Sequence, residues 1–456
     1  MAISAARKIA YEILRRVESE GAYASDLLHS ELGPQIKPED AALATEIVMG
    51  VLRWQRLLDS LLNRHMKKSV DRLDLPVALA LRIGIYQLRF LDRVPARAAV
   101  NESVELVKSA RKASAATLVN AVLRRAGGEA RKPPAKLLAT AASNGEQLAI
   151  LHSHPTWMVE RWLARWGEER TRALLEANNR TPRLSCAIHD MAQRDAVTND
   201  LRAAGLRISP GGLLESAFWV SGGSPARTEA FRTGKISIQD EASQMVPLLL
   251  EVQASERVLD LCAAPGGKTP PLVRGAGPGG MVVAGERHAH RLRAMREQFT
   301  RLNLSEVRLV EVDAEQALPF GVRFDRILVD APCSGTGTLA RHPEIRWRLL
   351  PEQLAEFHRL QSALLENAFE ALAPGGRLVY STCSMEPEEN EQVVGEVLKR
   401  RGDARVIGAD AGPSSLQGRL ADGLNAKDFF DGEGFFRTLP SEHPADGFFA
   451  AIIAKS

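Results

Sequence analysis

The stretch "RVLDLCAAPGGKT" at residues 257–269 reads as an apolar strand, a turn of small residues and the start of a helix. The same order recurs downstream, where the apolar runs "MVVAGE", "DRILVD" and "RLVYST" alternate with helical stretches. Such alternation is typical of a parallel, doubly wound sheet with helices on both faces. We therefore predict an α/β fold for residues 236–456.

The turn "AAPGG" at 263–267 follows the first predicted strand. Ligands of doubly wound sheets bind beyond the carboxyl ends of the strands, and small residues let a ligand approach the backbone closely. The dinucleotide pattern G-x-G-x-x-G is absent, and Lys268–Thr269 lacks the upstream glycine of a phosphate loop. These features favour a nucleotide-like ligand without a phosphate chain.

Three acids stand at three successive predicted strand ends, namely Glu286, Asp313 and Asp330. A carboxylate at the position of Glu286 can accept hydrogen bonds from both ribose hydroxyls, and Asp313 could meet an adenine amino group. Any one of these acids could instead be a helix N-cap or a solvated surface group. Their occurrence together favours a nucleoside-containing cofactor.

The chain has four cysteines, at 186, 262, 333 and 383, with no C-x-x-C pair and no matching histidine spacing. Neither a metal site nor a disulfide framework is predicted, which indicates a reducing compartment. Two of the thiols follow predicted strands in similar settings, "DAPCSGTG" (330–337) and "STCSMEPEEN" (381–390). A buried, inert cysteine is the alternative, and it suits Cys186 well.

Residues 1–140 carry apolar residues at helical spacing, which predicts an all-α bundle. They hold 23 Lys and Arg against 15 Asp and Glu, a net charge of +8, whereas the whole chain carries +3. The segment "GGEARKPPAK" at 127–136 predicts a linker. The basic side chains between 107 and 136 form either a solvated helix face or a surface for an anionic partner such as RNA. These side chains are Lys108, Arg111, Lys112, Arg124, Arg125, Arg131, Lys132 and Lys136.

Residues 145–235 combine a helical stretch with short β-like runs such as "LSCAIH" and "AFWVSG", which predicts a small α+β module. The chain is thus expected to form three domains, over 1–140, 145–235 and 236–456. No stretch approaches the roughly 18 apolar residues of a membrane span, and the N-terminus lacks a signal-peptide core. We expect a cytoplasmic protein without membrane contact.

The motifs "CAAPGGKT", "DAPCSGTG" and "STCSMEPEEN", with "QDEAS" (239–243) before them and "DGFFAA" (446–451) after them, closely resemble the Sun family of RNA 5-methylcytosine methyltransferases. The resemblance covers about residues 150–456 and implies a Rossmann-like methyltransferase domain that uses S-adenosylmethionine. The first 140 residues resemble the helical domain of the antitermination factor NusB. The combination is similar to bacterial enzymes that methylate 16S ribosomal RNA, which implies RNA as the partner, with 16S rRNA as the expected substrate. We also expect a monomer without metal.

Methylation of cytosine at carbon 5 would account for the two thiols in similar motifs. Carbon 5 of cytosine is not nucleophilic enough to take a methyl group until a nucleophile adds at carbon 6. A Pro-Cys thiol attacks in DNA cytosine methyltransferases, which would favour Cys333, so the residues alone leave the nucleophile open. The resemblance implies that Cys383 attacks, Cys333 assists release, Asp330 hydrogen-bonds the cytosine and Lys268 supports the same site. It implies as cofactor-binding residues Cys262, Ala263, Ala264, Pro265, Gly266, Gly267, Lys268, Glu286, Asp313 and Asp330.

The segment "ARHPEIRWR" at 340–348 offers Arg341, His342, Arg346, Trp347 and Arg348 as an edge of an RNA groove. Packing in a core is the alternative for Trp347. The middle module has "SCAIHD" at 185–190, which lacks the Arg and Asn of the family's segment there. Two other functions stay open, a transfer RNA cytosine-5 methyltransferase and a non-catalytic RNA-binding assembly factor.

Overall fold

The computed structural model describes residues 3–33, 35–129, 132, 143–408 and 414–456. The chain forms two compact units. Unit 1 comprises Met1–Thr181 together with Leu339–Leu349, and unit 2 comprises Pro182–Thr338 together with Leu350–Ser456. Most of the predicted linker at 127–136 lies outside the described residues. The domain limits expected at 140, 145 and 235 remain predictions.

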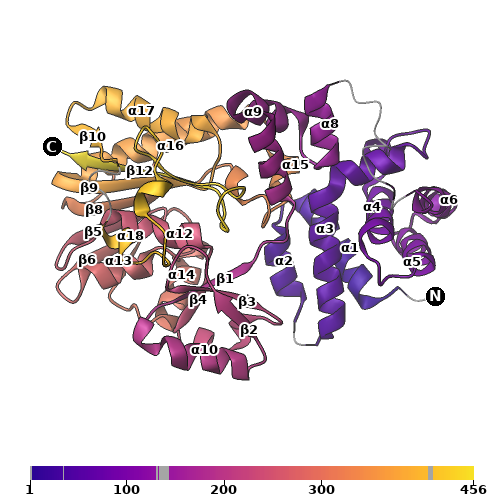
Figure 1. The fold of residues 1–456 in the computed structure, drawn as a ribbon, viewed down its shortest axis with the longest axis horizontal. Coiled ribbons are helices and arrows are strands. Elements are labelled where there is room, and N and C mark those ends of the chain that lie inside the picture. Colours follow the sequence, from indigo (N-terminus) through magenta and orange to yellow (C-terminus); the bar gives the residue numbers. More distant parts are fainter. Residues whose placement is uncertain (1–2, 34, 130–131, 133–142, 409–413) are drawn as a thin grey trace. The chain divides into compact units, whose positions relative to one another are not determined.

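Unit 1 is helical, as predicted for the N-terminal region (Figure 1). The helix at its centre, α4 (Leu75–Phe90), has every residue from Val77 to Leu88 buried, so the other helices cover it on all sides and it forms the core of the bundle. Its helices are α1 (Ala5–Glu20), α2 (Ala24–Glu31), α3 (Pro38–Asn63), α4 (Leu75–Phe90), α5 (Ala96–Ser109), α6 (Ala116–Gly127), α8 (Asn144–Leu151), α9 (Thr156–Asn178) and α15 (Ile345–Arg348).

The segment Leu339–Leu349 is part of unit 1 although it follows the Pro-Cys motif in sequence. Arg346 is 1% exposed, and its guanidinium donates to the carbonyls of Arg53 and Asn178 at 3.0 and 2.6 Å. The expectation that Arg346 faces RNA is therefore wrong, because main-chain acceptors surround its charge. Trp347 Nε1 donates to Leu52 O at 2.7 Å, which supports the packing alternative for this side chain.

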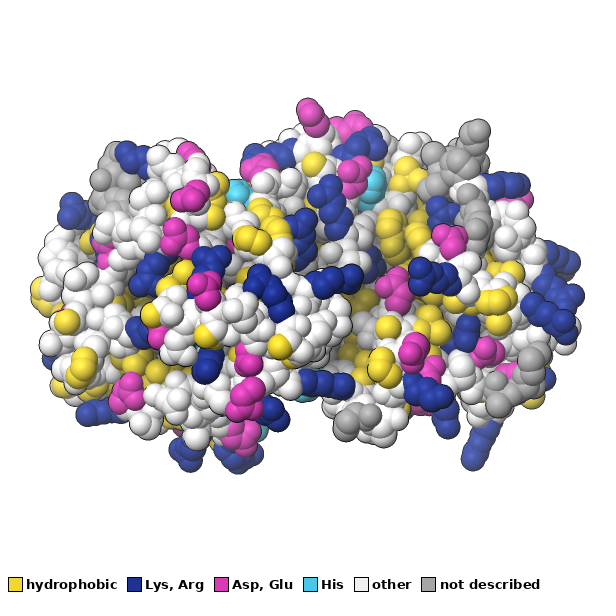
Figure 2. Space-filling model, turned by 60° about the horizontal axis from the view of Figure 1, so that its bottom comes forward, with side chains coloured by type: hydrophobic (Ala, Val, Ile, Leu, Met, Phe, Trp, Pro, Cys, Tyr) yellow, Lys and Arg dark blue, Asp and Glu magenta, His cyan; other side chains and the backbone are white. Residues whose placement is uncertain are grey.

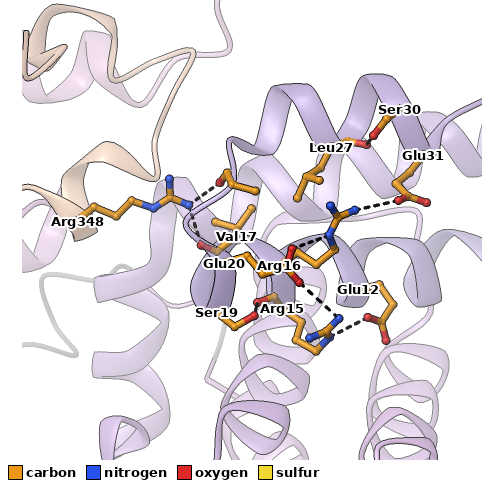
Figure 3. Close-up of polar contacts among 11 residues, drawn as sticks. Glu12, Arg15, Arg16, Val17, Ser19, Glu20, Leu27, Ser30, Glu31 and Arg348 are labelled. Carbon is orange, nitrogen blue, oxygen red and sulfur yellow. Dashed lines mark hydrogen bonds and ion pairs between the residues drawn. The ribbon is translucent and has the colours of Figure 1, made fainter. Parts of the chain in front are cut away.

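Arg348, at the end of α15, also makes its hydrogen bonds within unit 1. Its guanidinium donates to Val17 O at 2.7 Å, at the carboxyl end of α1 (Figure 3). It also donates to Gly21 O at 2.8 Å. Carbonyls at a helix end have no partner within the helix, so a cation there satisfies them and the helix dipole together. The two terminal nitrogens of Arg348 thus donate at this helix end, and a contact of this side chain with RNA stays a prediction.

Unit 2 begins with a four-stranded antiparallel sheet in the order β2-β3-β1-β4. Its strands are β1 (Leu184–Ile188), β2 (Arg207–Pro210), β3 (Ala217–Ser221) and β4 (Ile236–Ile238), with helix α10 (Arg194–Ala203) between β1 and β2. The predicted α+β fold of this module is confirmed, whereas the helical stretch expected at its start, α9, belongs to unit 1. Cys186 on β1 is fully buried, and burial raises the pKa of its thiol to about 12, in agreement with an inert packing role.

The larger sheet of unit 2 has the order β10-β12-β9-β8-β5-β6-β7, with β11 beside β12. Strands β7, β6, β5, β8 and β9 are parallel, whereas β12 is antiparallel to β9. The strands are β5 (Arg257–Leu261), β6 (Met281–Glu286), β7 (Arg308–Glu311), β8 (Phe324–Asp330), β9 (Leu372–Thr382), β10 (Ala404–Val406), β11 (Phe436–Thr438) and β12 (Phe448–Lys455). The chain reverses its direction of travel across the sheet between β5 and β8, which is where such folds bind ligands.

Helices cover both faces of this sheet, as the doubly wound prediction requires (Figure 1). Val258 of β5 packs in one apolar cluster with Leu272 of α13 (Thr269–Ala276), and its neighbour Leu259 packs in the other with Leu365 of α16 (Gln353–Ala371). Helices α12 (Glu241–Met245) and α14 (Ala289–Arg301) lie with α13, and α17 (Glu391–Arg400) lies with α16. Among the described residues, no helix is both long and apolar enough for a membrane span.

Candidate active site

The predicted cofactor turn leaves β5 in a tight backbone path. Cys262 has a φ of 62° and Gly266 a φ of 93°, both in the left-handed region. A Cβ at Gly266 would lie 2.8 Å from the ring of Phe299, so glycine is required there on two grounds. Ala263 N donates to Gly285 O at 2.8 Å, which fastens the turn to the end of β6. Burial raises the pKa of the Cys262 thiol, so this sulfur stays protonated beside the turn.

Asp260, in β5, is a buried carboxyl group that the sequence did not single out. Thr269 Oγ1 donates to its Oδ2 at 2.6 Å, while its Oδ1 has no hydrogen-bond partner among the described residues. Burial raises the pKa of Asp260 to about 7. Asp260 could have been predicted as a site residue from the sequence, because it is an acid among apolar residues of a strand that leads into the turn.

A pocket of about 230 Å³ lies at this turn. Residues 263–265 and Gly267 of the turn line it together with Asp260, and Gln239 and Ser243 line it from the "QDEAS" motif. Asp260 Oδ1 is thus an unsatisfied acceptor beside a pocket, a feature that fits a ligand with a polar donor such as an ammonium group. The residues present therefore suit the aminoacyl part of S-adenosylmethionine.

Asp330, the last residue of β8, is paired on both carboxylate oxygens. Lys268 Nζ lies 2.6 Å from Oδ2, and Ser381 Oγ donates to Oδ1 at 2.8 Å. Lys268 Nζ also lies 5.2 Å from the centre of the Phe448 ring, in the "DGFFAA" motif. Lys268 and Asp330 thus lie together, and Ser381 is a further member of this group that sequence reasoning missed.

The two thiols of the similar motifs meet in space. Cys333 Sγ and Cys383 Sγ are 3.3 Å apart and both residues are partly exposed. Their approach follows from the sheet, because β8 and β9 are adjacent parallel strands in which Asp330 is paired with Ser381. The hydrogen bond to Cys383 and burial raise the pKa of the Cys333 thiol well above its usual range, and the negative charge of Glu389 adds to this. These effects favour the protonated form of Cys333, and either sulfur of the pair can donate to the other.

The other two predicted cofactor acids lie farther along the sheet edge. Glu286 ends β6, is 4% exposed, and accepts a hydrogen bond from His288 N at 2.9 Å. Asp313 lies two residues beyond β7, which ends at Glu311 rather than at Asp313, and it accepts from Glu315 N at 3.2 Å. An ionised carboxylate offers about four acceptor sites, so both side chains keep capacity for a ligand.

Three family models match parts of the chain. Residues 247–454 match the model for 16S rRNA methyltransferase RsmB/F, and residues 4–127 match the NusB family. Residues 154–226 match the ferredoxin-like domain of RsmF/B-like methyltransferases. Among the described residues, no group of three or more His, Cys, Asp or Glu side chains could hold a metal ion.

Whole-length relatives and solved structures agree with these matches. The chain is 33% identical to the probable ribosomal RNA small subunit methyltransferase B of Synechocystis sp., over 99% of each chain. It is 34% identical to ribosomal RNA small subunit methyltransferase B of Vibrio cholerae, over 92% of this chain and 91% of the relative. The crystal structure of PH0851 is similar over 100% of both chains, with 25% identity and a TM-score of 0.81. The fold also matches NSun6 from Pyrococcus horikoshii with SFG, at 20% identity and a TM-score of 0.57, over 67% of this chain and 99% of that one.

Proposed function

The chain belongs to the RsmB/F family of 16S rRNA methyltransferases, and on this premise we propose that it transfers a methyl group from S-adenosylmethionine to carbon 5 of a cytosine in 16S rRNA. The observation that carries the proposal is the pair of thiols 3.3 Å apart, which follow the adjacent strands β8 and β9. Strand β8 also lies beside β5, the strand that leads into the predicted cofactor turn. A purely RNA-binding assembly factor has no use for two such thiols beside a paired carboxylate and lysine.

In the proposed reaction, Cys383 is the nucleophile. Its thiolate bonds to carbon 6 of the cytosine, and the ring electrons that this addition releases make carbon 5 nucleophilic. Asp330 hydrogen-bonds the ring, and the Lys268 ammonium at 2.6 Å keeps that carboxylate in place. S-adenosylmethionine, when bound, supplies the electrophilic methyl group.

Product release needs a second group. After methylation, carbon 5 must lose its proton and the Cys383 sulfur must leave carbon 6. Cys333 lies within 3.3 Å of that sulfur, close enough to give its own proton to the departing Cys383 thiolate and to accept the proton that carbon 5 loses. The electrons of the broken C–H bond restore the double bond between carbons 5 and 6 and break the bond from carbon 6 to sulfur. This is the division of labour that the resemblance implies, with Cys333 acting late and Cys383 acting first.

For the cofactor, we propose contacts along the carboxyl edge of β5, β6 and β7. The turn 262–267 approaches the ligand through its backbone, and Asp260 Oδ1 accepts from the ammonium group. Glu286 accepts from the ribose hydroxyls and Asp313 from the adenine amino group. Each of these groups has an acceptor site left over after its hydrogen bonds within the protein.

Unit 1 is proposed to bind the RNA. Arg124 and Arg125, in the last turn of α6, are exposed, and neither makes an ion pair among the described residues. By contrast, Lys112 pairs with Asp74 at 2.6 Å. Figure 2 shows Lys and Arg side chains interspersed with Asp and Glu on the face in view. Unpaired arginines are suited to phosphate contacts.

Incubation of the protein with labelled S-adenosylmethionine and separate pools of ribosomal and transfer RNA tests this proposal. We expect label in the small-subunit rRNA, with the modified base mapped as 5-methylcytosine. Label in transfer RNA alone would favour the alternative substrate, and binding of rRNA without methyl transfer would favour the assembly factor.

A further inference from the structure

Each of the two thiols is followed directly by a serine, and both serines reach one carboxylate. Ser334 Oγ and Ser384 Oγ each donate to Oε2 of Glu389, and Ser334 N donates to Oε1 at 2.7 Å. The two hydroxyl oxygens are 3.1 Å apart. The Glu389 side chain thus joins the loop after β8 to the loop after β9, immediately beyond the position of each sulfur. We call Glu389, Ser334 and Ser384 together the junction.

Neighbouring groups extend this junction to the other side of each thiol. Gln361 Nε2, from α16, donates to Glu389 Oε1 at 3.1 Å and to Pro332 O at 2.9 Å, so the residue before Cys333 is also held. Asn390 accepts from Thr382 Oγ1 at 2.5 Å and donates to Ser384 O at 2.9 Å, which brackets Cys383. Both sulfurs therefore sit between fixed neighbours.

Glu389 is a buried carboxylate at the centre of the junction, and its charge explains why both serine hydroxyls point toward it. The side chain is 0% exposed, and within the part of the chain that the structure describes no Lys or Arg pairs with it. Burial raises the pKa of Glu389, and the hydrogen bonds from Ser334, Ser384 and Gln361 oppose this effect. A buried carboxylate without a cation is costly unless donors surround it, and a carboxylate only accepts, so it directs both hydroxyls toward itself.

We propose that Glu389 is the positioning residue that sets the separation of Cys333 and Cys383. Among the described residues no hydrogen bond joins it to either reacting sulfur, so it acts on their positions through the serines that follow them. The catalytic consequence rests on the function proposed above, because both thiols must reach the same cytosine in succession. The geometric consequence does not depend on methyl transfer.

The effective concentration of one thiol at the other measures this geometry directly. Equilibration with reduced and oxidised glutathione measures this effective concentration. The two thiols lose two protons and two electrons to one oxidised glutathione, which gives one disulfide and two reduced glutathiones. Mass spectrometry identifies the peptide linked through residues 333 and 383. We expect Glu389→Gln, which keeps the shape but replaces an acceptor oxygen by a donor, to lower the effective concentration about tenfold or more. Glu388→Gln, the same charge change one residue earlier, should leave it within about twofold.

A second variant approaches the junction from the other side. Ser334→Ala combined with Ser384→Ala removes both hydroxyls with little change in volume, and it should reproduce the effect of Glu389→Gln. Adding Glu389→Gln to this double variant should change little more, because the same contacts are already lost. Thermal unfolding of each variant checks that unit 2 stays folded.

In methyl transfer, Glu389→Gln should lower kcat by about 100-fold while the KM for S-adenosylmethionine stays within about twofold. Wild-type effective concentrations in both Glu389→Gln and the double serine variant would overturn the proposal. A wild-type protein that does not methylate RNA would overturn the proposed function instead, and the glutathione equilibrium would still decide on Glu389.

Discussion

The ammonium nitrogen of Lys268 lies 2.6 Å from Oδ2 of Asp330, which joins the end of the cofactor turn to the end of β8. The two side chains are 12% and 29% exposed, so water screens the pair only in part. This pair is the point at which the proposed cofactor site and the proposed base site meet. Changes to either side chain should therefore affect chemistry more than folding.

Lys268→Met tests this pair. It removes the cation but keeps most of the apolar stem, so Asp330 loses its charged partner and the proposed orientation toward the cytosine. We expect the single-turnover rate of methyl transfer to fall by about 100-fold or more, with the melting temperature nearly unchanged. An activity close to that of the wild type would contradict the role given to Lys268.

Asp260→Asn tests the buried carboxyl group beside the pocket. Because burial raises the pKa of Asp260 from 3.8 to about 7, the folded protein binds more protons there than the unfolded chain between these two values. The stability contributed by this group is present at low pH and is lost as the pH rises through about 7. Asn does not titrate, so the melting temperature of the variant relative to wild type should rise between pH 5 and pH 8.

The same variant should bind S-adenosylmethionine more weakly, because the amide is a poorer acceptor for an ammonium group. Isothermal titration at pH 8 measures this loss, which we expect to be about tenfold. Stability and affinity should therefore change in opposite directions. A melting temperature difference that does not depend on pH would contradict the raised pKa.

Arg346→Met tests the insertion of 339–349 into unit 1. Arg346 donates to the carbonyls of Arg53, Ser153 and Asn178 and to the side chain of Asn179. Removing it leaves buried acceptors without donors, which should lower the free energy of unfolding of unit 1 by about 3 kcal/mol.

Arg124→Met, at an exposed position of α6, is the matched control for Arg346→Met and should leave the free energy of unfolding almost unchanged. Urea unfolding followed by circular dichroism measures both variants. If Arg346→Met instead weakened RNA binding without any loss of stability, Arg346 would belong to an RNA surface after all.

Arg124→Ala with Arg125→Ala tests the proposed RNA face of unit 1. If both side chains contact phosphates, the slope of log affinity against log salt should decrease by about 1.4 for single-stranded RNA. Fluorescence anisotropy with a labelled rRNA fragment measures the slope. Arg15→Ala is the control, because Glu12 and Glu20 already neutralise Arg15 on the surface of α1 (Figure 3).

The sequence alone was sufficient for those features that follow from local pattern. Strand alternation predicted the ends of β5, β6 and β8, and hence the positions of Glu286 and Asp330 at one edge of the sheet. The approach of the two thiols follows from the same pattern, since similar motifs end neighbouring parallel strands. The family resemblance added roles to Cys333 and Cys383 that spacing alone left open.

Other features depend on contacts between segments far apart in the chain. Arg346 looked like an exposed basic residue, and only its acceptors, which are 167 or more positions away in sequence, show that it is buried. Glu389 meets Ser334 across 55 positions, and nothing in the local run of acids separates it from Glu388. The unpaired oxygen of Asp260 likewise appears only once its surroundings are packed.

The most direct test of the central claim compares Cys383→Ala and Cys333→Ala on rRNA with S-adenosylmethionine present, using denaturing gels to detect protein bound covalently to RNA. We predict that Cys383→Ala forms no adduct and transfers no methyl group, whereas Cys333→Ala accumulates a covalent complex whose cytosine carries the transferred methyl group on carbon 5 and is still bonded to sulfur at carbon 6. An adduct formed by Cys383→Ala, or methyl transfer without the thiol of residue 383, would contradict the account.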